Sequence, residues 1–184
     1  YSIFKKEVEK EGLANLMKDI EIPLVPVLVR MQMHGVALDT DLLHEMSQVL
    51  ARNLLHLEQN VYDAFGGRKF NINSPSQLGE ILFKEMGLPG GKKTKSGGYS
   101  TDASVLEGLK TQIDLTPEQR AIVDAVLQYR ELNKLKSTYV DALPNMINHR
   151  TRRLHTRYNQ VGSATGRISS SEPNLQNIPV RTEI

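Results

Sequence analysis

The sequence predicts a mainly α-helical protein of the α+β class, in which a long antiparallel helix pair with a small helical tip precedes the first strands of a sheet. Apolar residues recur at steps of three and four along two long stretches, which is typical of helices that pack on one face. Apolar and polar residues alternate between positions 154 and 160, which favours a strand. With 184 residues, 39% of them hydrophobic, the chain is long enough to bury a core.

The N-terminal segment has the polar character of the last part of a helix over residues 1–20. Pro23 and Pro26 are expected to break this helix, because proline removes a backbone donor and crowds the preceding turn. The apolar residues 24–33 then predict either a buried connector or a short helix.

The first long helix is predicted from about residue 41 to residue 65. Asp39 or Thr40 can cap its start, since their side chains accept hydrogen bonds from a first helical turn. The pair Gly66-Gly67 provides the left-handed positions that commonly end a helix. Its apolar stripe consists of Leu43, Met46, Leu50, Leu54, Leu57, Val61 and Phe65.

A second long helix is predicted to start at Thr116, with Pro117 in its first position and Gln119 completing a capping box. Two helices of roughly 25 residues are each about 40 Å long, which suggests an antiparallel pair. The apolar stripe of the second helix consists of Ile122, Ala125, Tyr129, Leu132, Leu135, Tyr139 and Leu143.

Two short helices and a loop are predicted between the long ones. Residues 74–77 repeat the capping pattern and open a helix to about Met86, and Ser100 or Thr101 caps another that ends near Lys110. The glycine-rich loop between them carries Lys92, Lys93 and Lys95. A phosphate-backbone contact and a plain solvated turn both remain open for these lysines. The loop lacks the spacing of a Walker A motif.

The segment after residue 148 changes to a strand pattern. Residues 154–160 predict one strand, and residues 164–168 are expected to form a second strand of the same sheet. A two-stranded edge of this kind needs neighbours, because unpaired strands tend to fray or to pair with other chains.

The distribution of charge favours a partner that carries phosphate groups. The chain has a net charge of only +2, but residues 130–167 hold eight Lys or Arg against two acids, which gives this stretch +6. On the predicted second helix, Arg130 and Lys134 share one face, and Lys136 continues the basic run. An ordinary solvated helix face is the alternative interpretation.

Several classes of protein are excluded by composition. The absence of Cys excludes a disulfide scaffold and a thiolate metal site, and it fits a reducing compartment. No apolar run approaches the roughly 20 residues of a membrane span. The five His have no metal-ligand spacing, and no Ser-His-Asp pattern is present, so we expect neither a catalytic nor a metal-binding residue in this chain.

The most informative segment is the polar run over residues 165–179. It combines Arg167 and three serines with the carboxamides of Asn174, Gln176 and Asn177. Arginine and carboxamide side chains are those that reach into nucleic-acid grooves and contact base edges and sugars. The run therefore predicts contact with a nucleic acid.

Six segments together closely resemble family A DNA polymerases of the bacterial DNA polymerase I type. The likeness covers essentially the whole chain, and the run from Thr165-Gly166-Arg167 to Asn177-Ile178-Pro179 is its most specific part. The matching segments are residues 22–28, 70–74, 135–139, 154–160, 164–170 and 173–181.

The resemblance implies a division into three domains of such a polymerase. Residues 1–22 would be the last helix of an exonuclease-like domain. Residues 23–150 would form the thumb, with residues 23–40 as its connector. Residues 151–184 would be the start of the palm.

The resemblance also implies roles for individual residues on primer–template duplex DNA. Arg167 matches the arginine that reads the minor groove near the primer end, where acceptors lie in similar places for every base pair. The carboxamides of residues 174, 176 and 177 match contacts to template and primer. The matches to phosphate-backbone contacts are Arg130 and Lys134 on a thumb helix and Asn73, Ser100 and Thr101 at the tip.

The resemblance places the catalytic carboxylates and their two Mg²⁺ ions beyond Ile184, so we expect this chain to be an inactive fragment without a cofactor of its own. Deoxynucleoside triphosphates would be partners of the parent enzyme only. We expect a monomeric, cytoplasmic, bacterial protein associated with the nucleoid, without a membrane partner. The alternative is a stand-alone helical protein-interaction module that does not bind nucleic acid.

Overall fold

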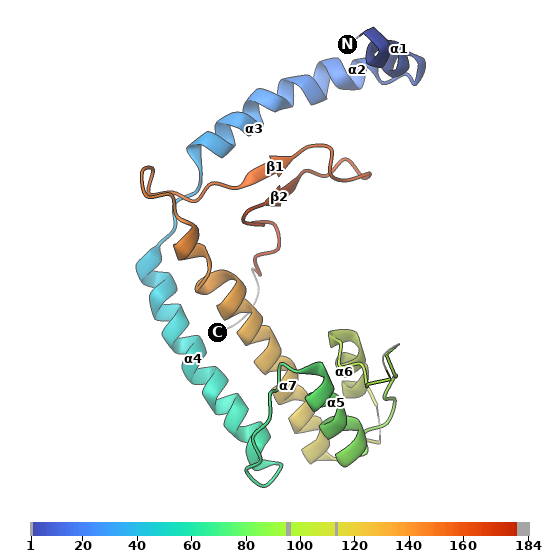
Figure 1. Ribbon diagram of the computed structural model, residues 1–184, viewed down its shortest axis with the longest axis vertical. Coiled ribbons are helices and arrows are strands. Elements are labelled where there is room, and N and C mark those ends of the chain that lie inside the picture. The colour runs from blue at the N-terminus through green and yellow to red at the C-terminus, as the bar shows by residue number, and fades with distance from the viewer. Residues whose placement is uncertain (1, 95–96, 113, 180–184) are drawn as a thin grey trace. The chain divides into compact units, whose positions relative to one another are not determined.

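The computed structural model describes residues 2–94, 97–112 and 114–179. The chain divides into two compact units. Within the described residues, one unit combines residues 2–40 with residues 143–179, and the other is formed by residues 41–94, 97–112 and 114–142 (Figure 1). Within the described ranges, helices dominate and a single two-stranded antiparallel sheet is present, which confirms the predicted mainly α class. No helix in these ranges has both the length and the apolar character needed to cross a membrane.

The N-terminal helices of the first unit are α1 (Ser2–Lys10), α2 (Ala14–Leu16) and α3 (Ile22–His34), with a π-helical turn at Met17–Glu21 between α2 and α3. The expected break at Pro23 and Pro26 is wrong. Pro23 lies in the first turn of α3, where little is lost by a missing donor, and Pro26 is accommodated inside the helix. The chain stays helical here, and the change before the prolines is the wider π turn at Met17–Glu21.

Helix α3 confirms the helical alternative for residues 24–33 but not the expected burial. Leu28 is its only buried residue, whereas Val25 and Met33 are 50% and 74% exposed. The helix ends at Gly35, whose φ of +67° is strained for any other residue. A Cβ at this position would lie 2.6 Å from the carbonyl oxygen of Leu154.

The sheet of the first unit pairs β1 (Arg157–Asn159) with β2 (Ser169–Ser171), and Tyr158 lies opposite Ser170. The first strand was predicted correctly in position, but the expected second strand at residues 164–168 is wrong. Those residues belong to the turn, because Gly166 takes a φ of +74° and donates its amide to the carbonyl of Ser163.

Hydrogen bonds to α3 and to the π turn before it hold the sheet region within the first unit. The Tyr158 amide donates to the Gln32 carboxamide at 3.1 Å, and the His155 ring lies 2.7 Å from the Gln32 carbonyl. Farther along, the Gln160 carboxamide donates to the Glu21 carbonyl at 2.9 Å. These hydrogen bonds fix β1 and the start of the turn after it against the N-terminal helices of the same unit.

The second unit is built on the antiparallel pair of α4 (Thr40–Asp63) and α7 (Pro117–Leu135) (Figure 1). The predicted capping box is confirmed, since Thr116 and Gln119 each accept a hydrogen bond from the backbone amide of the other. A π-helical turn at Lys136–Val140 extends α7. Near this end the Ser47 hydroxyl of α4 donates to the Asp141 carboxylate at 2.7 Å, which confirms the antiparallel arrangement.

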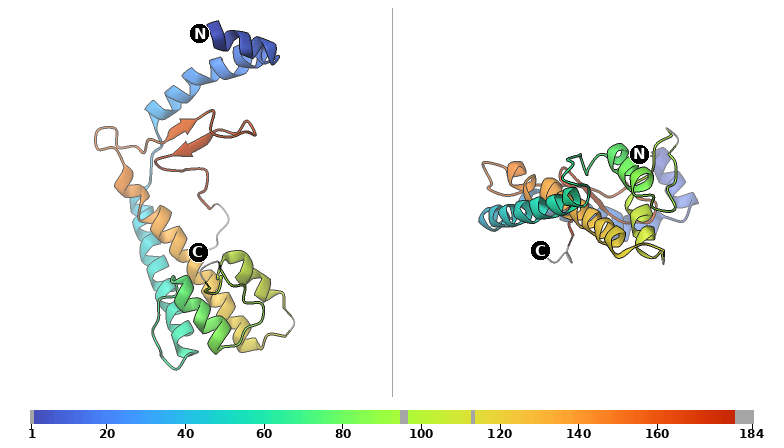
Figure 2. Two further views of the ribbon diagram at one scale, coloured as in Figure 1. Left: turned by 45° about the vertical axis from the view of Figure 1, so that its right-hand side comes forward. Right: turned by 90° about the horizontal axis from the view of Figure 1, so that it is seen from below.

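The tip of the second unit consists of α5 (Pro75–Gly79), a π-helical turn at Glu80–Glu85 and α6 (Ala103–Lys110), which lie beside the first half of α7 (Figure 2). Ser74 caps α5 as predicted. The prediction for α6 is corrected, because its N-cap position is Asp102 rather than Ser100 or Thr101.

One apolar core holds the tip and the helix pair together. Its buried members come from α4, α5, α6, α7 and the segments between them. They are Val61, Tyr62, Ile72, Leu78, Leu82, Phe83, Leu88, Leu106, Leu109, Leu115, Ile122, Val123 and Val126.

Candidate nucleic-acid interface

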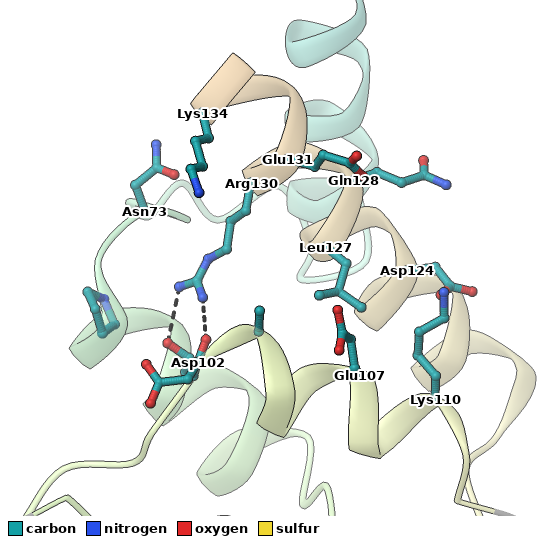
Figure 3. Close-up of a pocket in the computed structure, with 13 residues that line it drawn as sticks. Asn73, Asp102, Glu107, Lys110, Asp124, Leu127, Gln128, Arg130, Glu131 and Lys134 are labelled. Carbon is teal, nitrogen blue, oxygen red and sulfur yellow. Dashed lines mark hydrogen bonds and ion pairs between the residues drawn. The ribbon is translucent and has the colours of Figure 1, made fainter. Parts of the chain in front are cut away.

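A groove of about 810 Å³ lies on the tip, between α7 on one side and α6 with the segments that precede α5 and α6 on the other. Figure 3 shows Asn73, Arg130 and Lys134 at one end of it, and Glu107, Lys110 and Asp124 at the other. The Lys110 ammonium lies 2.7 Å from the Asp124 carboxylate, close enough for an ion pair but not aligned for a hydrogen bond. The lining holds three cations, Lys110, Arg130 and Lys134, and four carboxylates, Asp102, Glu107, Asp124 and Glu131.

The Arg130 side chain extends toward the segments before α5 and α6, and its guanidinium is hydrogen-bonded to them. Its two terminal nitrogens donate to the carbonyl and the hydroxyl of Thr101 and to the carbonyl of Ile72 (Figure 3). Burial lowers the pKa of the guanidinium, and the nearby Asp102 carboxylate acts in the opposite direction. The group remains charged, because arginine is not deprotonated in proteins.

The two lysines that follow on the same helix differ in their surroundings. Lys134 is exposed and lines the groove, and within the described part of the chain no hydrogen bond or ion pair involves its ammonium group. Lys136 lies 2.6 Å from the Asp141 carboxylate, and its side chain is only 21% exposed. Burial alone would raise the pKa of Asp141, but hydrogen bonds from Lys136 and Ser47 lower it overall.

The three tip residues predicted to contact a duplex occupy different depths. Asn73 is exposed, lines the groove and shares a hydrogen bond with Tyr129. Ser100 is half-buried, and its hydroxyl donates to the Asp102 carboxylate at 2.9 Å. Thr101 is only 2% exposed, so its side chain supports Arg130 instead of facing solvent.

The basic loop between α5 and α6 is folded back on itself. Lys93 pairs with Tyr99 in an antiparallel bridge, and the Ser100 amide donates to the Lys92 carbonyl at 2.7 Å. The side chains of Lys92 and Lys93 are exposed, whereas Lys95 lies outside the described residues. The loop thus presents at least two cations on a hairpin-like support.

In the first unit, Arg167 stands on the turn that joins β1 to β2. It is exposed, and among the described residues its guanidinium has no hydrogen bond or ion pair. Gly166 beside it adopts a left-handed conformation with a φ of +74°, which glycine takes up without strain. The position suits a side chain that reaches toward a partner.

The carboxamides after β2 are engaged in holding their own loop. Ser170 is 4% exposed, and its hydroxyl accepts the Leu175 amide at 3.2 Å. The Gln176 carboxamide accepts the Ser170 amide at 2.9 Å and donates to the Ile168 carbonyl, while the Asn174 carboxamide accepts the Gln176 amide at 3.0 Å. Asn177 is exposed at the end of this loop.

Sequence reasoning missed the residues that brace these two sites. Ser170 is one of three consecutive serines, and only its place opposite Tyr158 in the sheet shows that it faces inward. Asp102 is the N-cap residue of α6, but its carboxylate accepts from Ser100 and makes no capping bond to the helix, which its residue type does not indicate. Ile72 contributes only its backbone carbonyl, which accepts a hydrogen bond from Arg130, and no sequence pattern predicts that contact.

No metal site is formed by the described parts of the two units. No group of three or more His, Asp or Glu side chains in these parts could hold a metal ion. The residues present therefore do not fit the two Mg²⁺ ions of a polymerase active site.

Comparison with known proteins identifies the family to which this chain belongs. Residues 40–184 match the sequence model of DNA polymerase family A, and the chain therefore belongs to this family. It is 48% identical over 180 residues to DNA polymerase I of Rhizobium leguminosarum, which covers 98% of this chain and 17% of the relative. It is 50% identical over 176 residues to the thermostable DNA polymerase I of Thermus aquaticus, covering 95% of this chain and 20% of that protein.

A solved structure agrees with these matches. The POL domain of Pol1 from M. smegmatis in complex with DNA primer-template and dNTP has a TM-score of 0.82 and 36% identity, covering 97% of this chain and 30% of that one. The chain spans about a fifth of the length of the curated relatives. Family membership favours the polymerase interpretation over a stand-alone interaction module.

Proposed function

We propose that these 184 residues grip the backbone and the minor-groove side of a primer–template duplex, as the thumb and the start of the palm of a DNA-directed DNA polymerase. The observation that carries the proposal is the likeness, over 97% of the chain, to a polymerase domain solved with primer-template DNA. The exposed, unpaired state of Lys134 and Arg167 in the described structure supports it, because phosphate and groove contacts require accessible donors.

The domain assignment follows the resemblance. Residues 1–22 are proposed as the end of an exonuclease-like domain, residues 23–150 as thumb with its connector, and residues 151–184 as palm. The two Mg²⁺ ions and the deoxynucleoside triphosphate are proposed as partners of the whole polymerase, acting at carboxylates outside this segment. Residence in the cytoplasm near the nucleoid belongs to the same proposal.

The binding proposal is tested by fluorescence anisotropy of a labelled primer–template in a salt series. We expect a loss of affinity of roughly tenfold or more between about 50 and 200 mM salt, because each neutralised phosphate releases counterions. Two duplexes of unrelated sequence should bind equally well. A flat response to salt, or a strong preference for one sequence, would contradict the proposal.

Arg167→Ala separates the groove contact from the backbone grip. In this chain alone the substitution should weaken duplex binding only slightly. In a polymerase that carries this segment, primer extension should fall markedly, because the primer end must be held at the catalytic site. Equal extension by the variant and the parent would remove Arg167 from the proposed interface.

A further inference from the structure

We propose that Arg130 is a positioning residue, whose guanidinium sets the two loops that present Asn73 and Ser100 at the groove, while Lys134 makes the contact with phosphate. The proposal deepens the duplex-binding function proposed above and rests on it. It assigns different tasks to two cations that share one face of α7.

The acceptors of Arg130 adjoin the two contact residues in the chain. The carbonyl of Ile72, which immediately precedes Asn73, lies 3.4 Å from one terminal nitrogen. Thr101, which immediately follows Ser100, offers its hydroxyl at 3.1 Å to the same nitrogen and its carbonyl to the other one. One planar group thus joins both loops to α7.

These bonds use most of the donor capacity of the side chain. Three of the five N–H groups of the guanidinium are directed at the protein. Their acceptors belong to Ile72 and Thr101, which are 1% and 2% exposed, so water does not replace the bonds. Arg130 is half-buried and lines the groove, and its guanidinium is bound to the two loops that form this end of it.

Lysine is unable to reproduce this arrangement. Its ammonium group is a point charge on a flexible stem, and it lacks the planar fork that spans two loops. Arg130→Lys therefore preserves the charge near the groove and removes the brace. A direct phosphate contact would survive this substitution largely intact, whereas a positioning role would not.

The same helix provides a matched control. The guanidinium of Arg120 also donates to two backbone carbonyls, those of Lys110 and Gln112, the latter at 3.0 Å. It braces the end of α6, where no residue is predicted to contact DNA. Arg120→Lys should loosen that end of the tip and leave duplex affinity unchanged.

The test combines a double-mutant cycle with hydrogen exchange on the 184-residue chain. We expect Arg130→Lys to lower affinity for a primer–template at least about threefold and to speed amide exchange in residues 71–74 and 100–106. Asn73→Ala should cost less in the Arg130→Lys background than in the parent, because the brace acts through that loop. Thr101→Val, which removes one acceptor only, should change exchange in the same direction by less, and it keeps the test informative if Arg130→Lys folds poorly.

Two results would overturn the positioning role. Unchanged exchange in both loops of Arg130→Lys would do so, as would additive losses of affinity for Arg130→Lys and Asn73→Ala. If the parent chain binds no duplex at all, the proposed function fails, and the exchange measurement alone then decides whether the brace exists.

Discussion

The groove on the tip and the loop after β2 solve the same problem with different chemistry. Within the described structure, the groove presents Lys134 and the β1–β2 turn next to that loop presents Arg167, each an exposed cation without an ion pair. The groove is supported by the half-buried guanidinium of Arg130, in a tip that contains a continuous apolar core. The loop is supported by neutral hydrogen bonds around the hydroxyl of Ser170. The comparison teaches that side chains of the types that bind nucleic acid have two tasks here. Some, such as Lys134 and Arg167, are free to contact a partner, and others, such as Arg130 and Gln176, hold the protein's own loops.

The largest expected effect concerns the core under the groove. Leu106 is fully buried in α6, so Leu106→Ala should lower the free energy of unfolding by about 2–5 kcal/mol through lost contacts and a residual cavity. Thermal and denaturant unfolding measure this loss. Leu55, which is 66% exposed on α4, provides the control, and Leu55→Ala should change stability by less than about 0.5 kcal/mol.

Hydrogen exchange would sharpen the comparison further. In Leu106→Ala, amides of the tip should exchange faster, while the amide of Leu154, bonded to the Val36 carbonyl in the other unit, should keep its protection. Equal acceleration in both units would show that the two supports are not independent.

Ser170→Ala should be the next largest change. The Ser170 hydroxyl accepts a hydrogen bond from the Leu175 amide, and Ser170 is only 4% exposed. Without this acceptor the amide would be a buried, unsatisfied donor, which costs about 1–3 kcal/mol. The expected result is faster exchange of the Leu175 amide and of its neighbours in the loop. Ser171, exposed one residue later, is the matched control, and Ser171→Ala should leave this exchange rate unchanged.

The pH dependence of the helix pair gives a smaller effect. Burial, together with the hydroxyl's hydrogen bond to Glu58 and that group's charge, raises the pKa of Tyr62 to about 12, whereas its hydrogen bond to the Phe70 carbonyl acts in the opposite direction. Tyrosine in an unfolded chain titrates near 10. Between these values the folded state holds the extra proton, so the free energy of unfolding should fall with rising pH by up to about 1.4 kcal/mol per pH unit.

Tyr62→Phe isolates this contribution from other groups that titrate in alkali. The difference in unfolding free energy between parent and variant should be constant below pH 10 and should shrink as the pH approaches 12. A difference that stays constant over the whole range would show that Tyr62 titrates normally.

The sequence carries much of this fold in local signals. The capping box at Thr116 and the glycines after α4 depend on neighbouring residues and were predicted correctly. The predicted stripe of α4 is buried or half-buried throughout, whereas that of α7 left out Val123 and Val126, which are fully buried. The errors arose where a local pattern is compatible with more than one backbone conformation. Pro26 inside α3 is tolerated in a helix whose preceding π turn no pattern indicates, and β2 begins after Gly166 because that residue turns the chain.

The candidate site was predictable in composition but not in its division of tasks. Arg130, Lys134 and Lys136 are equally basic in sequence, yet only the folded chain shows that one reaches carbonyls and another pairs with Asp141. Gln176 likewise has the side chain of a base-contacting residue, while its oxygen accepts the amide of Ser170. Such assignments depend on which backbone groups the fold leaves within reach.

The most direct test of the account compares the salt dependence of duplex binding for Lys134→Met and Lys136→Met. The two lysines lie two residues apart, and the account assigns phosphate contact to the unpaired Lys134 and an internal ion pair to Lys136. We expect Lys134→Met to reduce the slope of log affinity against log salt by roughly 0.9, the value for one phosphate contact. Lys136→Met should leave the slope unchanged. Equal slopes for Lys134→Met and the parent, or a reduced slope for Lys136→Met, would contradict the division between contact and support.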